Sequence, residues 1–302
     1  MANLKEIRTR IASVASTRQI TSAMKMVAAA KLKKAQDIVT NFRPYALKME
    51  EIMLHAASSI GHDPDNKFAY EREYKQVLIV VITSNRGLCG AFNSNIIKEA
   101  VQLAERKYGN YIHPVKIRYL SIGKKGYDVL RKRRVNLDEP ITEVIEQPTY
   151  EKAAKIAQSL MDSFVAGRYD CIDIVYNEFI NAASQKVICK QFLPLLPEEQ
   201  YAGNNNKKPK NGKAQQTDYI FEPTKEYILR ELIPQNLRLM LYEALLDSIA
   251  SEYGARMTSM HQATDNATTL IQDLTLQYNK ARQAAITNEI LEIVGGAEAL
   301  KS

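Results

Sequence analysis

The sequence predicts an α/β fold in which a long antiparallel coiled coil of N- and C-terminal helices is joined to a central α/β domain. Three observations support this class. Both ends of the chain are almost free of glycine and proline, the residues that interrupt helices. Apolar residues recur along both ends at alternating steps of three and four. Between the ends, short β-branched runs alternate with helix-forming stretches, as in proteins whose strands are connected by helices.

The N-terminal segment, residues 3–59, is rich in Ala, Lys, Met and Arg, which all favour helices. The first glycine of the chain is Gly61, and the only earlier proline is Pro44. The alternation places Leu4, Ile7, Ile11, Val14, Arg18, Thr21, Lys25, Ala28, Leu32, Ala35, Val39 and Phe42 on one stripe. This stripe is apolar at both ends and polar in its middle, and its spacing predicts a coiled-coil seam.

The C-terminal segment repeats the pattern. No proline follows Pro234, and only Gly254 interrupts the segment before Gly295 and Gly296. Its stripe consists of Tyr253, Met257, Met260, Thr264, Ala267, Ile271, Leu274, Tyr278, Ala281 and Ala285. At about 1.5 Å per residue, the two helices would reach roughly 85 Å and roughly 90–100 Å. A compact chain of this length has a radius of gyration of only about 19 Å. We therefore expect residues 1–60 and 225–302 to wind around each other as an antiparallel coiled-coil shaft.

Residues 61–224 are predicted to form a Rossmann-like α/β domain. Strands are expected at Lys75–Thr83, Val115–Ile122, Cys171–Tyr176 and Lys186–Phe192, and helices at Ser94–Tyr108, Gly126–Arg133 and Tyr150–Phe164. This alternation predicts a largely parallel sheet with helices on its faces. Residues 201–216 are polar and rich in Asn and Lys, which predicts a flexible surface loop.

The composition excludes several classes of protein. The longest purely aliphatic run, Val77–Ile82, is far shorter than the roughly 20 residues that span a bilayer. No apolar segment follows the charged start, so no secretory signal peptide is expected. The three cysteines (Cys89, Cys171 and Cys189) form no CxxC pair, and the four histidines lie far apart. We therefore expect neither a disulfide framework nor a metal site, and no cofactor.

The net charge of +7 is unevenly distributed. Residues 1–48 carry ten Lys or Arg against two acidic residues, whereas residues 228–302 carry six against nine. A basic segment suits a polyanion, so a coiled-coil scaffold or nucleic-acid-binding protein is one alternative function. That alternative predicts salt-sensitive DNA binding, but the sequence lacks aromatic–basic interleaving and any known nucleic-acid motif. The acidic C-terminal segment could instead be the partner of the basic one within the same chain.

Two glycine-containing turns suggest a second alternative, a nucleotide-using α/β enzyme. The turn Ser84–Asn95 (SNRGLCGAFNSN) lies between a strand and a helix, but it has neither the GxGxxG nor the GxxxxGK[ST] spacing. The segment Ser121–Tyr127 (SIGKKGY) lacks the hydroxyl of a P-loop. We expect Gly87 and Gly90 to permit a tight turn and Cys89 to be packed within it. The enzyme alternative predicts instead that replacing either glycine abolishes nucleotide binding.

Several polar residues of the long helices are not explained by packing. Arg18, Thr21 and Lys25 fall within the first stripe, and Arg256, Lys280, Arg282, Gln283 and Thr287 belong to the second helix. A coiled coil shaped by stability alone would carry Leu and Ile in its seam. The sequence therefore favours a surface that contacts other subunits, and the alternative is a solvated face with local ion pairs.

Five segments together resemble one family over essentially the whole chain. They are MKMVAAAKLKKAQ (Met24–Gln36), NFRPYA (Asn41–Ala46), SNRGLCGAFNSN (Ser84–Asn95), ASEYGARMTSMHQATDNA (Ala250–Ala267) and YNKARQAAITNEILEIVGGAEAL (Tyr278–Leu300). In this order they resemble the gamma subunits of F-type ATP synthases. The C-terminal blocks are highly specific, and a generic coiled coil would not also carry the central glycine turn.

The resemblance implies a non-catalytic rotor. In that family the paired helices form the central shaft inside a ring of three alpha and three beta subunits, with one copy per complex. The α/β domain forms a foot that binds the epsilon subunit and the membrane ring of c subunits. Ion flow turns the c ring and the shaft, which drives the three catalytic beta sites through their conformations for ATP synthesis, reversibly with ATP hydrolysis.

The resemblance also implies contacts with the alpha and beta head. These are Arg256 in the GARM block, Arg282, Gln283 and Thr287 in KARQAAIT, and Met24, Lys25 and Lys31 on the N-terminal helix near acidic loops of beta. Such contacts should be weak and movable, because tightly buried ion pairs would stall rotation.

Two features separate this chain from parts of the family. The region near residues 201–216 has no cysteine, unlike the redox-switch insertion of chloroplast members, so thiol regulation is not expected. The chain begins with MANLKEIRTRI and no transit peptide, which favours a bacterial protein at the cytoplasmic side of the inner membrane, where it would be peripheral.

Overall fold

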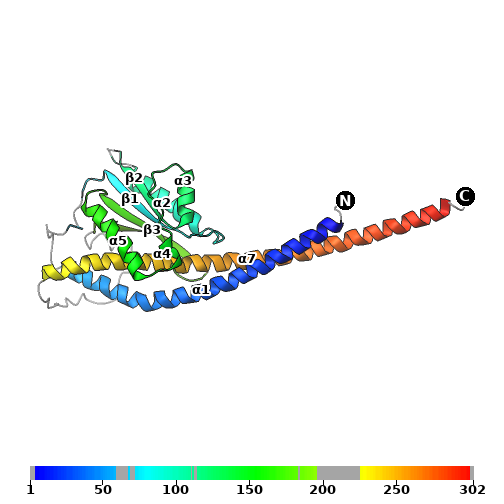
Figure 1. Cartoon of the computed structure of the whole chain (residues 1–302), viewed down its shortest axis with the longest axis horizontal. Helices are drawn as coiled ribbons and strands as arrows, with labels where there is room; N and C mark the ends of the chain where they lie inside the picture. Colours follow the sequence, from blue (N-terminus) through cyan, green and yellow to red (C-terminus); the bar gives the residue numbers. More distant parts are fainter. Residues whose placement is uncertain are drawn as a thin grey trace. The chain divides into compact units, whose positions relative to one another are not determined.

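The computed structural model describes residues 4–58, 67–68, 72–109, 111, 114–182, 184–195 and 225–299. The predicted loop at 201–216 lies outside these residues. Along the chain the elements are α1 (Leu4–Ser58), β1 (Gln76–Ile82), α2 (Phe92–Tyr108), β2 (Lys116–Ile122), α3 (Lys124–Lys132), α4 (Glu143–Glu146), α5 (Tyr150–Val165), β3 (Cys171–Phe179), β4 (Gln185–Leu193) and α7 (Lys225–Ala299) (Figure 1). The predicted α/β class with long terminal helices is confirmed.

The chain divides into two compact units. The terminal unit consists of Met1–Ala30 and Arg256–Ser302, and the central unit consists of Lys31–Ala255. This division falls within both long helices, so the central unit contains the sheet together with adjoining parts of α1 and α7. The domain boundaries at residues 60/61 and 224/225 remain a prediction from the sequence.

In the terminal unit, α1 and α7 pack along the stripes that the sequence predicted. Ile7 and Ala28 of α1 are buried, as are Met260, Ala267 and Leu274 of α7. Of the three polar residues in the first stripe, only Thr21 is buried; Lys25 is half-buried and Arg18 is exposed. Thr21 donates to the Arg18 carbonyl at 3.0 Å and accepts from the Thr264 hydroxyl at 2.9 Å. The polar middle of the seam is therefore hydrogen-bonded across the two helices.

In the central unit, the same two helices run antiparallel. The Lys31 ammonium lies 5.5 Å from the centre of the Tyr253 ring, and the Phe42 and Tyr242 rings pack edge to face at 5.1 Å. Since low numbers on α1 meet high numbers on α7, the helices point in opposite directions. Between these aromatic contacts, a buried apolar cluster contains Ala35, Val39, Leu246, Ile249 and Ala250.

The sheet has the strand order β2-β1-β3-β4. β1 pairs in parallel with β2 and β3, and its residues Val77–Ile82 are at most 1% exposed because it is covered on both faces. β4 pairs antiparallel with β3, since the short connection between them permits only a hairpin. The four predicted strands are thus confirmed, whereas the four-residue helix α4 was not predicted.

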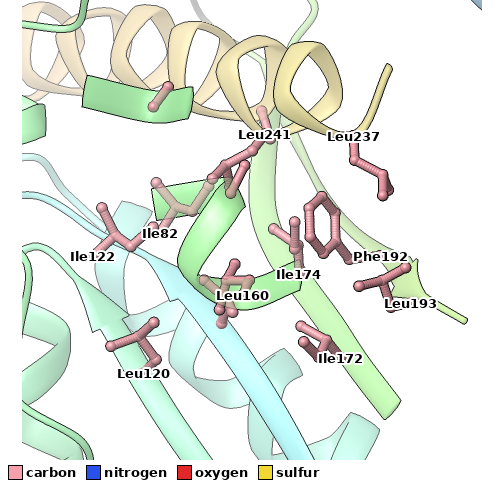
Figure 2. Close-up of a cluster of buried hydrophobic side chains, with 14 of the residues drawn as sticks. Ile82, Leu120, Ile122, Leu160, Ile172, Ile174, Phe192, Leu193, Leu237 and Leu241 are labelled. Atoms are coloured by element: carbon pink, nitrogen blue, oxygen red, sulfur yellow. The ribbon is translucent and has the colours of Figure 1, made fainter. Parts of the chain in front are cut away.

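Each face of the sheet has its own core, and α7 completes one of them. On one face, α5 and α7 pack against the sheet, where Leu237 and Leu241 of α7 join Ile174 and Phe192 of the strands (Figure 2). On the other face, Ile96 and other residues of α2 pack against β1 and β3. The shaft helix α7 is therefore part of the hydrophobic core of the α/β domain.

An ion pair joins the two long helices inside this unit. The Arg43 guanidinium of α1 lies 3.4 Å from the Asp247 carboxylate of α7, which is 5% exposed. Burial raises the pKa of Asp247 from its ordinary value of 3.8 to about 7, and the nearby Glu243 and Glu178 also raise it, while Arg43 lowers it. The burial effect is larger than the attraction of Arg43, because the carboxylate loses most of its hydration.

This raised pKa predicts a pH-dependent stability. Between about pH 4 and pH 7 the folded chain keeps the Asp247 proton that the unfolded chain has lost, so stability falls as the pH rises through this window. Asp247→Asn should remove that fall, and its melting temperature should exceed that of the unchanged protein by more at pH 8 than at pH 5. Thermal unfolding followed by circular dichroism at both pH values measures this. An equal difference at the two pH values would contradict the assignment.

Candidate functional site

The first glycine turn is filled by its own side chains. The Ser84 amide donates to the Asn93 side-chain carbonyl at 3.0 Å, and the Asn93 amide group donates to the Ser84 hydroxyl at 2.7 Å. The same amide group donates to the Cys89 sulfur at 3.2 Å, and Cys89 is only 2% exposed. Gly90 has a φ of +57°, a conformation that glycine adopts without strain. The structure therefore confirms a tight turn with a packed cysteine.

The second glycine segment, Ser121–Tyr127, is hydrogen-bonded to the start of the first one. In the first turn of α3, the amides of Lys124, Lys125 and Gly126 donate to the Asn85 side chain, the Ser84 carbonyl and the Thr83 hydroxyl, at 3.0–3.1 Å. These are the donors that a helix N-terminus would offer to a phosphate. Because the turn after β1 already accepts them, SIGKKGY packs two loops together and does not form an anion cradle.

The usual ligand position of an open α/β sheet is also occupied. The chain leaves β1 for β2 on one side and later returns to β3 on the other, so the carboxyl ends of β1 and β3 form the topological switch point where such folds bind ligands. Here the Ser248 hydroxyl of α7 donates to the Ile82 carbonyl at 3.5 Å, and the Ser251 hydroxyl donates to the Asn177 carbonyl at 3.2 Å. Helix α7 thus covers the carboxyl ends of both strands.

Close packing of α7 extends to the β3–β4 hairpin. A Cβ atom on Gly254 would lie 3.0 Å from the Ala182 carbonyl oxygen, tighter than an ordinary contact. The glycine therefore lets the helix approach this hairpin.

A buried charged cluster lies between α2, β3 and β4. The Lys107 ammonium donates to the Asp173 carboxylate at 2.8 Å and to the Gln191 side chain at 2.8 Å, and the Tyr108 hydroxyl also donates to Asp173. Asp173 is 3% exposed, and its carboxylate forms an ion pair with the Lys107 ammonium and accepts a hydrogen bond from the Tyr108 hydroxyl. Burial, followed by the Asp173 charge, raises the pKa of Tyr108 far above its ordinary value. The cluster joins α2 to the sheet.

The thiols near this cluster are not nucleophiles. Burial raises the pKa of Cys171 to about 12, with a further increase from Asp173, and burial and Glu99 raise the pKa of Cys189 to about 12. Both thiols therefore stay protonated at neutral pH, whereas the thiolate is the reactive form.

The described part of the chain offers little room for a small ligand. A hollow of about 20 Å³, roughly the space of one water molecule, is lined by Ala46, Lys190, Asn236, Leu239, Met240 and Glu243. Among the described residues, no three His, Cys, Asp or Glu side chains are grouped closely enough to hold a metal ion. No described helix combines the length and apolar character needed to cross a bilayer.

The predicted contact residues are distributed over both units. In the terminal unit, Met24 and Lys25 are half-buried, while Arg282, Gln283 and Thr287 are exposed on α7. The Thr287 hydroxyl donates to the Gln283 carbonyl at 2.9 Å. Arg256 is only 9% exposed, so it offers little surface to another subunit. Lys31, in the central unit, is exposed beside Tyr253.

Sequence reasoning missed an apolar surface at the end of α7. Ile286, Ile290, Leu291, Ile293 and Val294 are 48–71% exposed, and this part of the helix extends beyond the start of α1 (Figure 1). The sequence contained a signal for this surface, because apolar residues continue along α7 beyond Ala285, the last position of the predicted stripe. Exposed apolar groups in such a row mark a surface that another protein covers.

These features define a class. The terminal unit is a pair of long helices with an exposed apolar end, and in the central unit the usual ligand position of the sheet is covered by the chain's own helix. This describes a subunit that acts through contacts with partner proteins.

The comparisons identify the family. A family model described as ATP synthase matches residues 3–300. The ATP synthase gamma chain of Flavobacterium psychrophilum is 55% identical over 301 residues, covering 100% of both chains, and that of Flavobacterium johnsoniae is 52% identical over 300 residues, covering 99% of both. The chain therefore belongs to the ATP synthase gamma chain family, whose members are non-catalytic central-stalk subunits of a rotary synthase.

Solved structures agree with this fold. A chain from the central stalk and c-ring of the Tetrahymena thermophila mitochondrial ATP synthase is 29% identical, with a TM-score of 0.57, covering 81% of this chain and 99% of that one. A chain from the Euglena gracilis mitochondrial ATP synthase is 24% identical, with a TM-score of 0.67, covering 98% of this chain and 94% of that one. The latter likeness bears on the fold alone.

The close contact between the two loops predicts that position 126 must be glycine, because a larger residue has no room there. A Cβ atom there would lie 2.5 Å from the Ser121 hydroxyl oxygen and 2.6 Å from that of Thr83. Gly126→Ala should therefore lower the free energy of unfolding by about 1–3 kcal/mol, measurable by urea unfolding. Gly87→Ala is the matched control, since its nearest neighbour is the flexible end of Lys125 at 3.9 Å. A large loss in the control with none at Gly126 would contradict this packing.

Proposed function

We propose that this chain forms the rotating shaft of its ATP synthase and contacts the alpha and beta subunits of the head through the terminal unit. One copy would occupy the ring of three alpha and three beta subunits. The main support for this proposal is the exposed apolar end of α7, residues 286–294. A helix end with such a surface needs an apolar sleeve, that is, a surrounding partner surface that buries it. A ring of subunits around the helix would supply that sleeve.

Five of the predicted contact residues would act as movable contacts with the head. On α7 the exposed members are Arg282, Gln283 and Thr287. On α1, Met24 and Lys25 are half-buried. Exposed hydrogen bonds and ion pairs contribute roughly 0–1 kcal/mol each, weak enough to exchange as the shaft turns. Lys31 is the corresponding cation of the central unit. Arg256 would act within the chain, because it is buried.

Rotation would be coupled to catalysis by differences in contact energy. A shaft shifts the conformations of three catalytic sites only if it binds their states with different free energies. Because the terminal unit pairs two different helices, α1 and α7, it has no threefold symmetry around its axis (Figure 1). Each beta subunit would therefore face a different side of the shaft at any moment.

The α/β domain would bind the epsilon subunit and the membrane ring of c subunits. The support for the ring is the likeness to a stalk chain solved together with a c-ring. Together with the bacterial relatives, this favours a peripheral position at the cytoplasmic side of the inner membrane. Ion flow through the ring would then drive ATP synthesis, and ATP hydrolysis would drive the reverse rotation.

Reconstitution tests the proposal. The full chain, mixed with matching alpha and beta subunits, should give a stable complex with sustained ATP hydrolysis, and removing residues 279–302 should weaken it. The truncation takes away the exposed apolar end together with the three polar contacts. A chain that neither joins the ring nor alters its turnover would overturn the proposal.

A matched pair of threonines sharpens this test. Thr287 and Thr275 are both exposed on α7, and both hydroxyls donate to the carbonyl four residues earlier, at 2.9 and 2.7 Å. Thr287→Ala should lower the hydrolysis rate of the reconstituted complex about two- to fivefold, the effect of losing one exposed contact. Thr275→Ala should leave the rate unchanged although it alters the helix in the same way. Equal losses in both variants would assign the effect to the helix itself.

A further inference from the structure

The end of α3 carries a cluster of positive charge that none of the contacts above uses. Arg131, Lys132, Arg133 and Arg134 follow one another, and all four are exposed. None of them forms an ion pair with any residue that the structure describes. We call these four residues the α3 basic cluster.

Two acidic residues that lie close to the cluster in sequence are engaged elsewhere. Asp138, which follows it in the chain, accepts from the Arg118 guanidinium at 2.8 Å and from the Tyr169 hydroxyl at 2.9 Å. Asp128 of α3 lies 4.0 Å from the Lys125 ammonium. The positive charge of the cluster is therefore not neutralised by these two neighbours.

The backbone at Arg134 is a second, independent observation. Arg134 has a φ of +57°, and its amide donates to the Arg131 carbonyl at 3.1 Å, so it ends the helix in the left-handed conformation. Glycine or asparagine is favoured at this position because a Cβ atom is strained there. The backbone alone would favour glycine here, and four adjacent like charges add repulsion. An arginine kept at a strained position points to a use for its side chain.

We infer that the α3 basic cluster binds the anionic phospholipid headgroups of the membrane. The side chains are long and exposed, and none of them lines the hollow described above. They offer no shaped pocket for a single acidic group, so they fit a diffuse array of negative charge such as a bilayer surface. The inference rests on the proposed membrane-peripheral position of the chain.

Vesicle binding by the full chain tests this inference. The chain should sediment with vesicles of phosphatidylcholine and phosphatidylglycerol but not with phosphatidylcholine alone, and added salt should weaken binding. Each cation near an anionic bilayer contributes roughly fivefold to the partition coefficient. Arg131→Gln with Lys132→Gln should therefore reduce binding about 25-fold. The matched control, Lys33→Gln with Lys34→Gln, removes two exposed charges from α1 and should change binding little.

Arg134→Gly separates binding from folding. This variant should raise the melting temperature, because glycine relieves the strained backbone, and still reduce binding roughly fivefold. Binding that ignores phosphatidylglycerol, or equal losses in both double variants, would overturn the inference. The inference would also be overturned if the full chain failed to bind vesicles and the α3 variants instead lost affinity for an acidic partner protein. Assembly with alpha and beta subunits is measured independently of vesicle binding. A chain that assembles but binds no vesicle would contradict this inference and not the proposed function.

Discussion

The structure depends on the packing of α7 against two partners at once. In the central unit, one side of this helix meets α1 through Val39, Leu246 and Ile249, and another side meets the sheet through Leu237 and Leu241. A coiled-coil helix that also completes a domain core cannot turn independently of that domain, because rotation would expose both apolar surfaces. This double burial fixes α7 to the α/β domain within the central unit.

The same helix explains why an α/β sheet of this topology has no ligand crevice at its switch point. Ser248 and Ser251 satisfy the carbonyls at the ends of β1 and β3, and Gly254 lets the helix backbone come close to the hairpin. In the neighbouring loops, the amides of α3 are used by the turn after β1. In this fold, which is often associated with nucleotides, the polar groups at these positions are thus satisfied internally.

Several residues are placed at a cost to stability. Asp247 is buried with a pKa of about 7, Arg134 occupies a strained conformation, and the apolar end of α7 is exposed. The terminal unit also keeps hydroxyl groups in its seam, where Leu or Ile would pack better. Of these features, the exposed apolar end of α7 is the one expected of a subunit that contacts partner proteins.

The two long helices, their seams and the four strands could be predicted from the sequence, because hydrophobic period and glycine–proline content are local properties. The sequence also carried the resemblance to gamma subunits. Three features could not be predicted: Arg256 is buried, Arg18 is exposed although it lies on the seam stripe, and Asn93 and α3 close the glycine turns. These outcomes depend on contacts between residues far apart in the chain, such as Ser251 and Asn177, whose distance no local pattern specifies.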